Sequence, residues 1–422
     1  MPQIAGGNRG AAYKIEQEGG GNEKIQETKA QFLAFRIILP AASTFFSFCR
    51  AMADLFLLLS SFLSLFACFP GFHFVYADAA LIQPFQTPIN RDLYHSCTDL
   101  IEKINSLVHR HPEKLTVETL KSGTEGYNAD VTVVTYGQSG KQSDDRFKIR
   151  ILLGFGQHSR ELITPELALQ IVSILSEEQF LPGMDLASLN GTLENLVIKL
   201  VPLENLNGRK LVEAGELCER RNGRGVDLNR NWGVDWGRKE KNYDPVEEYP
   251  GTAPFSEPET QIMREIATSF NPHIWVNVHS GTAALFMPYD HKNSTPDRVS
   301  SQRMRVLTEE LNKVHCHGRC KTGSGGASVG YLAHGTATDY MYDVVRVPMS
   351  FTFEVYAGDK TLDEDCFKMF NPVDQTTFER VLNQWCGILF ALFKLGPREI
   401  DVHSTIIENS FDQVYNWKDA RL

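Results

Sequence analysis

The chain has 422 residues, of which 42% are hydrophobic and 22% are charged. These fractions are those of an ordinary globular protein, and the length suits one sizeable domain with its own core. The formal net charge of −10 at pH 7 makes the protein a poor candidate for binding nucleic acid.

The N-terminal region divides into two parts. Residues 1–51 begin with a polar, Gly-rich stretch, and we expect a disordered or spurious extension there. Leu55–Phe69 is an uninterrupted apolar run, too short for an ordinary transmembrane helix, and small residues follow it up to Ala77. Residues 52–77 are therefore predicted to be a signal peptide, with translation starting at Met52. An uncleaved membrane anchor is the alternative.

Six strand-like runs and two helical patterns follow along the chain. The helical patterns cover Pro165–Gln179 and Glu257–Phe270. Strands that alternate with helices predict an α/β fold with a mixed, mostly parallel sheet and helices on both faces. The predicted strands are Leu115–Leu120, Asp130–Tyr136, Phe147–Phe155, Leu196–Pro202, His273–His279 and Met349–Val355.

Polar residues stand at the ends of three of these strands. His158 and Glu161 follow the third run, His279 ends the fifth, and Glu354 lies near the end of the sixth. In open α/β sheets ligands bind beyond the carboxyl ends of the strands. Two imidazoles and a carboxylate make a zinc site with an open fourth position, and a second carboxylate can act as general base.

Each of these motifs taken singly is more often a structural feature, such as a hydrogen-bonded core histidine. Their shared position at strand ends favours the functional interpretation. Glu161 and His279 are 118 positions apart, whereas a structural zinc site takes its ligands from a short stretch. The sequence therefore predicts a zinc hydrolase.

Four segments of the chain resemble the zinc carboxypeptidases of the A/B type. GQHSRELITPE resembles that family's zinc-binding turn, GVDLNRNW its substrate-carboxylate segment, PFSEPET a characteristic loop and SFTFE the strand with the catalytic base. The four occur in the family's order, from about Tyr94 to about Leu395. The resemblance implies an eight-stranded sheet and a catalytic domain over residues 78–395, with residues 396–422 as a C-terminal tail.

The resemblance also implies roles for the metal-site residues. His158, Glu161 and His279 match the ligands of one zinc ion, and Glu354 matches the general base. Asp227 falls where the family has a carboxylate that orients the first zinc histidine, which is the usual support for a metal-bound imidazole.

Further residues match substrate-side positions of the family. Arg220 matches an arginine that polarises the scissile carbonyl, although the adjacent Arg221 leaves this register open by one residue. Asn229 and Arg230 match the pair that binds the terminal carboxylate of the substrate, and a guanidinium can do so with two parallel hydrogen bonds.

Two more positions complete this set. Arg160 matches a further substrate-side arginine. Tyr331 matches a mobile tyrosine that closes over the bound terminus, but the alignment needs a one-residue insertion between it and the base.

Two positions disagree about specificity. Asp290 matches the aspartate with which the regulatory members face a C-terminal Arg or Lys, whereas Thr338 stands where the digestive B-type enzymes have an acid. We favour basic C-terminal residues, because an unpaired carboxylate in a desolvated pocket is costly and a cation is its natural partner. The alternatives are an Asp290 turned to solvent and an A-type preference for apolar residues.

The length before His158 bears on regulation. The digestive members carry a folded inhibitory pro-segment, but here the residues after Ala77 are needed for the first strands. We expect no pro-segment and an enzyme that is active as made. The tail, residues 396–422, is too short for the small β-sandwich of the regulatory members.

Cysteine usage favours export to the extracellular space or to a vacuolar or other endomembrane lumen. Six cysteines outside the leader predict up to three disulfides: Cys97, Cys218, Cys316, Cys320, Cys366 and Cys386. The close spacing of Cys316 and Cys320 favours a disulfide over a second metal site with His315 and His317. Asn190 and Asn293 begin glycosylation sequons.

Two other functions stay open. An inactive, peptide-binding family member would be expected to lack a zinc ligand or the base, and all four residues are present. A zinc amidohydrolase of acylated amino acids, or a deglutamylase of intracellular tails, is disfavoured by the leader and by the Asn229-Arg230 pair. We therefore expect a monomeric enzyme whose partners are peptide and protein C-termini.

Overall fold

The structure is a computed structural model, and it describes residues 89–124, 126–137, 148–358 and 366–400. The chain divides into two units, Met1–Ile82 and Gln83–Leu422, and all described residues belong to the second unit. The predicted extension, signal peptide and membrane anchor, and nearly all of the tail, lie outside the described residues. None of the helices in the described part has the length and apolar character needed to span a membrane.

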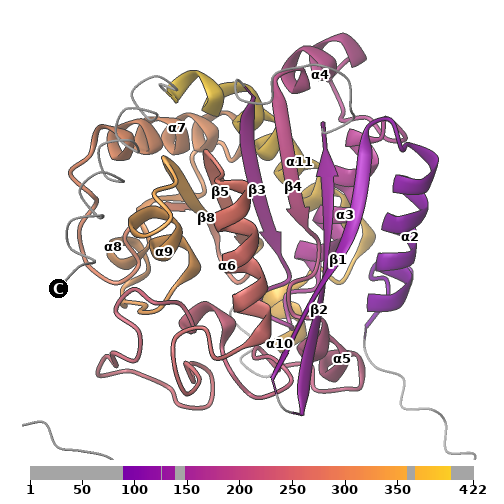
Figure 1. The fold of residues 1–422 in the computed structure, drawn as a ribbon. Helices are drawn as coiled ribbons and strands as arrows, with labels where there is room; N and C mark the ends of the chain where they lie inside the picture. Colours follow the sequence, from indigo (N-terminus) through magenta and orange to yellow (C-terminus); the bar gives the residue numbers. More distant parts are fainter. Residues whose placement is uncertain (1–88, 125, 138–147, 359–365, 401–422) are drawn as a thin grey trace, which may run out of the picture. The chain divides into compact units, whose positions relative to one another are not determined.

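An eight-stranded sheet forms the centre of the unit (Figure 1), in the order β1-β2-β4-β3-β5-β8-β6-β7. The four central strands β4, β3, β5 and β8 pair in parallel, while β1 with β2, β2 with β4, and β6 with β8 pair antiparallel. This confirms the predicted mixed sheet. The strands are β1 Leu115–Thr124, β2 Tyr127–Tyr136, β3 Ile149–Phe155, β4 Leu196–Val201, β5 Ile274–His279, β6 Ala283–Met287, β7 Lys321–Ser324 and β8 Met349–Val355.

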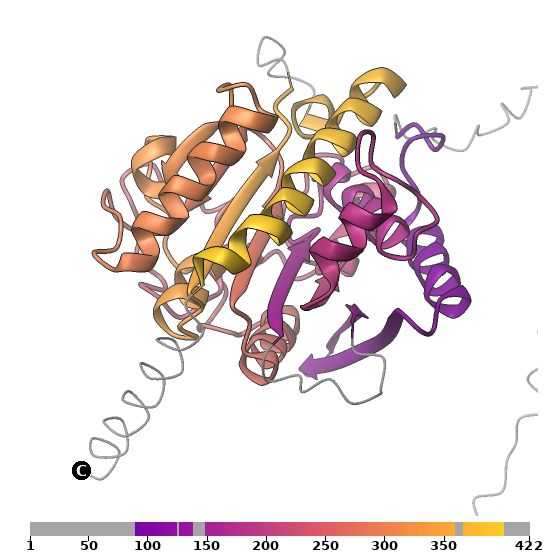
Figure 2. The same ribbon diagram turned by 90° about the horizontal axis from the view of Figure 1, so that it is seen from above.

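Helices cover both faces of the sheet. The helices are α2 Cys97–Arg110, α3 Ile163–Leu175, α4 Leu186–Leu193, α5 Leu206–Glu213, α6 Pro258–Phe270, α7 Val299–His315, α8 Gly325–Val329, α9 Ala337–Asp343, α10 Cys366–Phe370 and α11 Gln375–Leu395, with short 3-10 turns η2 Leu228–Arg230 and η3 Gly396–Glu399. Seen from above, the strands run between α11 and α6 (Figure 2). The sheet is therefore the middle of three layers.

Two hydrophobic cores lie on the two faces, because successive side chains of a strand point to opposite sides. On β3, Leu153 and Phe155 join the core under α2, α3, α7 and α11, while Leu152 joins the core under α6 and α9. On β5, Val276 and Trp275 divide in the same way. Strands buried on both faces explain the nearly continuous apolar runs in the sequence.

Helix α3 ends at Leu175, although the sequence pattern predicts a helix to Gln179. Glu177 has a positive φ of 64°, and the amides of Glu178 and Gln179 both donate to the carbonyl of Ser173. A left-handed residue of this kind turns the chain out of a helix. The boundary thus depends on one backbone conformation that apolar spacing does not encode.

The disulfides differ from the largest set that the cysteine count allows. Cys218 pairs with Cys366, and Cys316 pairs with Cys320, which confirms a disulfide in place of a second metal site there. Cys97 and Cys386 are free and buried. Two disulfides among the described residues fall within the predicted maximum of three, and Cys97 and Cys386 pack instead as small apolar side chains in α2 and α11.

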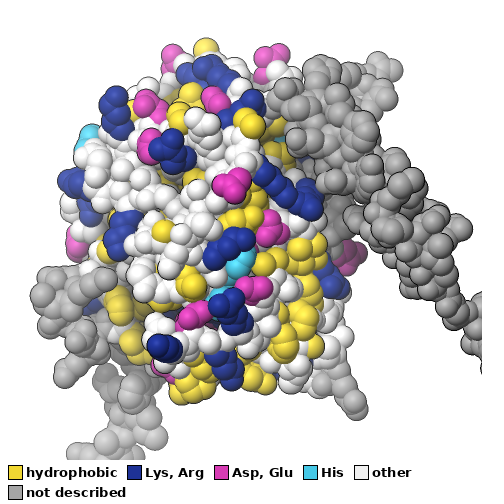
Figure 3. Space-filling model, turned by 90° about the vertical axis from the view of Figure 1, so that its left-hand side faces the viewer, with side chains coloured by type: hydrophobic (Ala, Val, Ile, Leu, Met, Phe, Trp, Pro, Cys, Tyr) yellow, Lys and Arg dark blue, Asp and Glu magenta, His cyan; other side chains and the backbone are white. Residues whose placement is uncertain are grey.

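Charged side chains of both signs alternate over the face shown in Figure 3, with histidine side chains among them near its middle.

Candidate active site

The candidate site lies where three parallel strands end. β3 ends at Phe155, three residues before His158, and β5 ends at His279. In the parallel pairing of β5 with β8, His279 stands directly opposite Glu354. Since the carboxyl ends of parallel strands meet at one edge of the sheet, residues far apart in sequence come together there.

His158, Glu161 and His279 bring their polar atoms to one point. Nδ1 of His158 lies 2.8 Å from Oε1 of Glu161 and 3.0 Å from Nδ1 of His279, and Nδ1 of His279 lies 3.1 Å from Oε2 of Glu161. All three side chains are buried, and they are the one group of this kind among the described residues. Two imidazoles and a carboxylate are the donor set of a catalytic zinc site, so the residues present fit that ion.

A second layer of polar groups orients these three. Oδ1 of Asp227 lies 3.2 Å from Nε2 of His158, on the ring side opposite to Glu161, and the amide of Ser280 donates to Oε2 of Glu161 at 3.0 Å. A carboxylate behind a histidine fixes the ring and its tautomer, which is the usual support for a metal ligand.

The protonation of the three groups also suits a cation. Burial and the charge of Arg220 lower the pKa of His158. Burial alone would raise the pKa of Glu161, but the imidazoles of His158 and His279 hold it below its usual range. Burial alone would lower the pKa of His279, but Glu161 raises it. Glu161 is thus held as a carboxylate, and a metal ion competes with protons for ligands of this kind.

Glu354 differs from Glu161, although both carboxylates lie at the same edge of the sheet. Burial, together with the charge of Glu161, raises the pKa of Glu354 to about 7, while the charge of His279 acts against this rise. A general base works best when its pKa is near the operating pH. The arrangement therefore provides one ionised carboxylate and one that can accept and release a proton.

The two neighbouring arginines separate in the structure. Nε of Arg220 donates to Oδ2 of Asp227 at 2.9 Å, which holds the guanidinium beside the three clustered residues. Arg221 turns away and pairs with Glu219 through two bonds of 2.8 Å. Arg220 is thus the arginine that lies at the site. Burial would raise the pKa of Asp227, but Arg220 and Arg230 hold it well below its usual value.

Asn229 and Arg230 lie in the short turn η2. Asp227 caps this turn by accepting from the amide of Asn229 at 2.9 Å, and Oδ1 of Asn229 accepts from the amide of Ala337 at 3.0 Å. Arg230 is buried, with Nη1 donating to the carbonyl of Asn229 at 3.0 Å and Nη2 to Oε1 of Glu248 at 2.8 Å. Asp227, which contacts His158, and Arg230 thus belong to one short turn.

Arg160 is buried beside the same group of residues. Its guanidinium stacks over the ring of Phe370 at 4.3 Å, and Nη1 donates to the carbonyl of Cys218 at 2.9 Å. Nη2 lies 2.7 Å from Oε2 of Glu247. An acidic doublet, Glu247-Glu248, therefore pairs with two of the arginines that the sequence assigns to substrate.

The doublet is the feature of the site that the sequence analysis missed. Glu247 and Glu248 lie shortly before the PFSEPET string, which begins six positions after Glu248, and they belong to a loop without regular secondary structure. Two consecutive carboxylates between the arginine-bearing segment and that string are the signal that could have indicated it.

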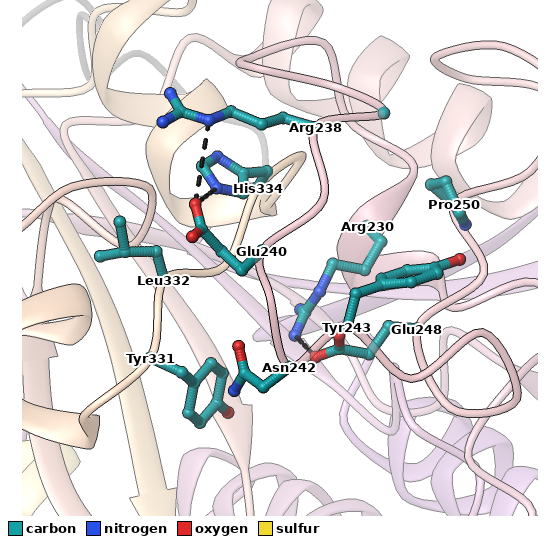
Figure 4. Close-up of a pocket in the computed structure, with 11 residues that line it drawn as sticks. Arg230, Arg238, Glu240, Asn242, Tyr243, Glu248, Pro250, Tyr331, Leu332 and His334 are labelled. Carbon is teal, nitrogen blue, oxygen red and sulfur yellow. Dashed lines mark hydrogen bonds and ion pairs between the residues drawn. The ribbon is translucent and has the colours of Figure 1, made fainter.

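Tyr331 lies apart from the buried residues. Its side chain is 43% exposed, and it lines a pocket with Arg230, Tyr243 and Glu248 (Figure 4). The figure shows the guanidinium of Arg230 directed at Glu248, with Tyr331 on the far side of Asn242. Tyr331 thus stands at the edge of this pocket, partly open to solvent.

Asp290 is buried, in contrast to the alternative in which it turns to solvent. Its amide donates to both carboxylate oxygens of Asp339 at 3.0 Å. Burial and the charge of Asp339 raise the pKa of Asp290 to about 7, while Arg230 and His279 act against this rise. Asp290 is therefore within electrostatic range of the site.

Thr338, the other specificity position, is also buried and carries no charge. Its hydroxyl lies 2.6 Å from that of Thr352 on β8, so the two hydroxyls bond each other. The structure thus places one acid and one neutral residue at the two positions.

Comparison with known proteins agrees with this geometry. The family model for zinc carboxypeptidases matches residues 100–380. The chain belongs to the zinc carboxypeptidase family. It is 28% identical over 280 residues to carboxypeptidase B2 of Mus musculus and 26% identical over 279 residues to carboxypeptidase A2 of the same species, covering 62% and 64% of this chain. It spans 63% and 64% of the length of these relatives.

Solved structures share the fold of this family member. The crystal structure of thrombin-activatable fibrinolysis inhibitor matches with a TM-score of 0.61 and 20% identity over 74% of this chain and 77% of that one. Carboxypeptidase A of Helicoverpa armigera matches with a TM-score of 0.60 and 20% identity over 72% and 74%. Both have the layered α/β fold described above.

Proposed function

We propose that the protein is a zinc-dependent carboxypeptidase that hydrolyses the C-terminal peptide bond of peptides and proteins. The convergence of His158, Glu161 and His279 beside Glu354, with Arg230 anchored in the same turn as Asp227, carries the proposal. A metal site beside a carboxylate-binding arginine suits a substrate whose free terminus lies next to the scissile bond.

His158, Glu161 and His279 would hold one zinc ion, which when bound lowers the pKa of its water towards ~7 and polarises the carbonyl. Glu354 takes the proton from the attacking water and passes it to the leaving nitrogen, a role that suits its pKa of about 7. Arg220 stabilises the developing oxyanion, and a single donor of this type contributes ~3 to 4 kcal/mol.

Asn229 and Arg230 bind the terminal carboxylate in this proposal, because a buried guanidinium presents a planar fork to a carboxylate. Arg160 binds a part of the substrate that lies further from its C-terminus. Tyr331 turns over the bound end of the substrate, which its exposed position at the pocket edge allows.

We propose a preference for substrates that end in Arg or Lys. Asp290 supports this, because it is a buried acid near Arg230, and the described part of the chain places no cation in direct contact with it. The neutral Thr338 supports the second candidate, an A-type preference for apolar termini. We favour the preference for Arg or Lys because of Asp290, since desolvating an ionised carboxylate is favourable only when a cation accompanies it.

The proposed setting is the extracellular space or an endomembrane lumen. A signal peptide over residues 52–77, a catalytic domain over 78–395 and a monomeric, active product without pro-segment belong to this proposal. The two disulfides support an oxidising compartment. Asn190 and Asn293 are exposed, so both sequons are accessible to glycosylation. N-terminal sequencing of the secreted protein should start close to Asp78, whereas a start at Met1 with the apolar segment in a membrane would favour the anchor.

A zinc analysis combined with one activity assay tests the function. The purified protein should contain one zinc ion per chain and release the C-terminal residue from a blocked dipeptide, and a chelator should abolish this release. Zinc binding with no release from any blocked dipeptide would favour the inactive, peptide-binding alternative.

A further inference from the structure

Glu248 binds the guanidinium group of Arg230, which the proposed function assigns to the terminal carboxylate of the substrate. Its Oε1 accepts from Nη2 of Arg230 at 2.8 Å, and the neighbouring Glu247 pairs with Arg160 at 2.7 Å. We propose that Glu248 competes with the terminal carboxylate of the substrate for Arg230 and thereby sets the affinity of the site for substrate. This inference rests on the proposed function, because it takes Arg230 as the carboxylate-binding group.

Both terminal nitrogens of Arg230 are engaged in the free protein. Nη1 donates to the carbonyl of Asn229 at 3.0 Å, and Nη2 donates to Glu248. A carboxylate that binds a guanidinium with two parallel bonds needs two of its N–H groups on one side. A substrate terminus that takes Nη2 as one of its two donors therefore competes directly with Glu248.

The backbone beside Glu248 is fixed, so the loop does not carry the carboxylate away. The carbonyl of Tyr249 accepts from the amide of Asp227 at 2.8 Å, and the carbonyl of Pro250 accepts from the side chain of Asn231 at 2.7 Å. Asp227 in turn contacts the ring of His158. Withdrawing this segment would disturb the candidate metal site itself.

The side chain of Glu248 can leave on its own. It is 24% exposed, whereas the side chain of Arg230 is 9% exposed. Rotation about its side-chain bonds takes the carboxylate from the guanidinium into solvent, while Arg230 keeps its bond to Asn229. The guanidinium thus stays in place for an incoming carboxylate, and only the competitor moves.

The competition predicts a change in substrate affinity without a change in chemistry. Glu248→Gln should lower KM for a blocked dipeptide with a free terminal carboxylate by roughly three- to ten-fold, at unchanged kcat, because a partly exposed ion pair contributes little more than this factor. Glu309→Gln on α7 is the matched control. Glu309 pairs with Arg305 at 3.4 Å on an exposed helix face, so the variant makes the same change in charge and should keep the KM of the wild type.

A pair of ligands separates competition from a general change in the pocket. N-acetylarginine should bind the zinc-loaded Glu248→Gln protein roughly three- to ten-fold more tightly than the wild type, as measured by calorimetry, while the binding of its amide should not change. An equal gain for acid and amide, or no gain for the acid, would overturn the inference. The binding measurement needs no turnover, so a protein that cleaves no dipeptide refutes the proposed function while the competition is still judged from the two ligands.

Discussion

Glu161 and Glu354 lie at one edge of the sheet, and their surroundings give them different roles. Two imidazoles hold the pKa of Glu161 below its usual range against the effect of burial, whereas burial raises the pKa of Glu354 to about 7. When the pKa values of two carboxylates are pushed apart in this way, the one with the lower pKa stays ionised and the one with the higher pKa can carry a proton. Glu161 therefore suits a metal ligand, and Glu354 suits a base.

Glu354→Gln should keep the metal and lose nearly all turnover, because the variant removes a base without removing a ligand. The loss expected for a general base is ~100- to 10,000-fold in kcat. Zinc content by atomic absorption and steady-state kinetics measure the two effects. His279→Ala should lose both zinc and activity, and near-wild-type kcat in a zinc-loaded Glu354→Gln protein would show that the base is another group.

Asp290→Ala should change specificity and leave the reaction intact. Removing one partner of a buried ion pair costs ~3 to 5 kcal/mol, so kcat/KM for a C-terminal Arg should fall by at least ~100-fold. Substrates that end in Leu or Phe should be little affected. Parallel assays on the two dipeptide series measure this. A wild-type preference for Phe over Arg would refute the role of Asp290, as would an equal loss for both series.

At the scale of elements, a buried chain of polar side chains ties three strand ends together. Nε2 of Gln157, just after β3, lies 3.2 Å from Oε1 of Glu204, which follows β4. Oε1 of Gln157 accepts from the side-chain Nδ2 of Asn277 on β5 at 3.0 Å. All three side chains are completely buried. Gln157 directly precedes His158 in sequence, and Asn277 lies two positions before His279.

The stability of the fold should depend on pH through Glu204. Burial and the charge of Glu259 raise its pKa to about 8 from the ordinary 4.5. Its neutral form stabilises the fold fully below about pH 4.5, and this contribution, on the order of a few kcal/mol, is lost as the pH rises to about 8. Glu204→Gln stays neutral, so it should gain stability relative to the wild type over this range in urea unfolding. Parallel curves for the two proteins would contradict the assignment.

The strands and the strand-end residues could be predicted because burial on both faces leaves clear apolar runs. His158, His279 and Glu354 then follow from the rule that such strands end at a common edge. The pairing of Glu247 and Glu248 with the arginines could not be predicted, since it depends on the path of a loop without regular structure. The free Cys97 and Cys386 could not be predicted either, because sequence shows the number of cysteines but not which of them meet.

At the scale of the molecule, one disulfide joins two segments of the candidate site that are far apart in sequence. Cys218 lies two residues before Arg220, and its partner Cys366 begins α10, which is followed by Asn371. The side chain of Asn371 donates to the carbonyl of Arg160 at 2.8 Å and accepts from the amide of Ile163 at 3.0 Å. The crosslink thus connects the segment of Arg220 with the residues that hold the turn after His158.

The two disulfides should contribute very different amounts to stability. Cys218 and Cys366 are 148 residues apart, whereas Cys316 and Cys320 are 4 apart. The entropy that a crosslink removes from the unfolded chain grows with the logarithm of the loop, which gives about 5 kcal/mol for the long loop and about 2 kcal/mol for the short one. Replacing both cysteines of each pair by serine and measuring the free energy of unfolding in urea tests this. We expect the Cys218/Cys366 double variant to lose more than twice as much as the Cys316/Cys320 variant, which is its matched control. Equal losses would show that local contacts around each bridge, rather than chain entropy, determine its contribution.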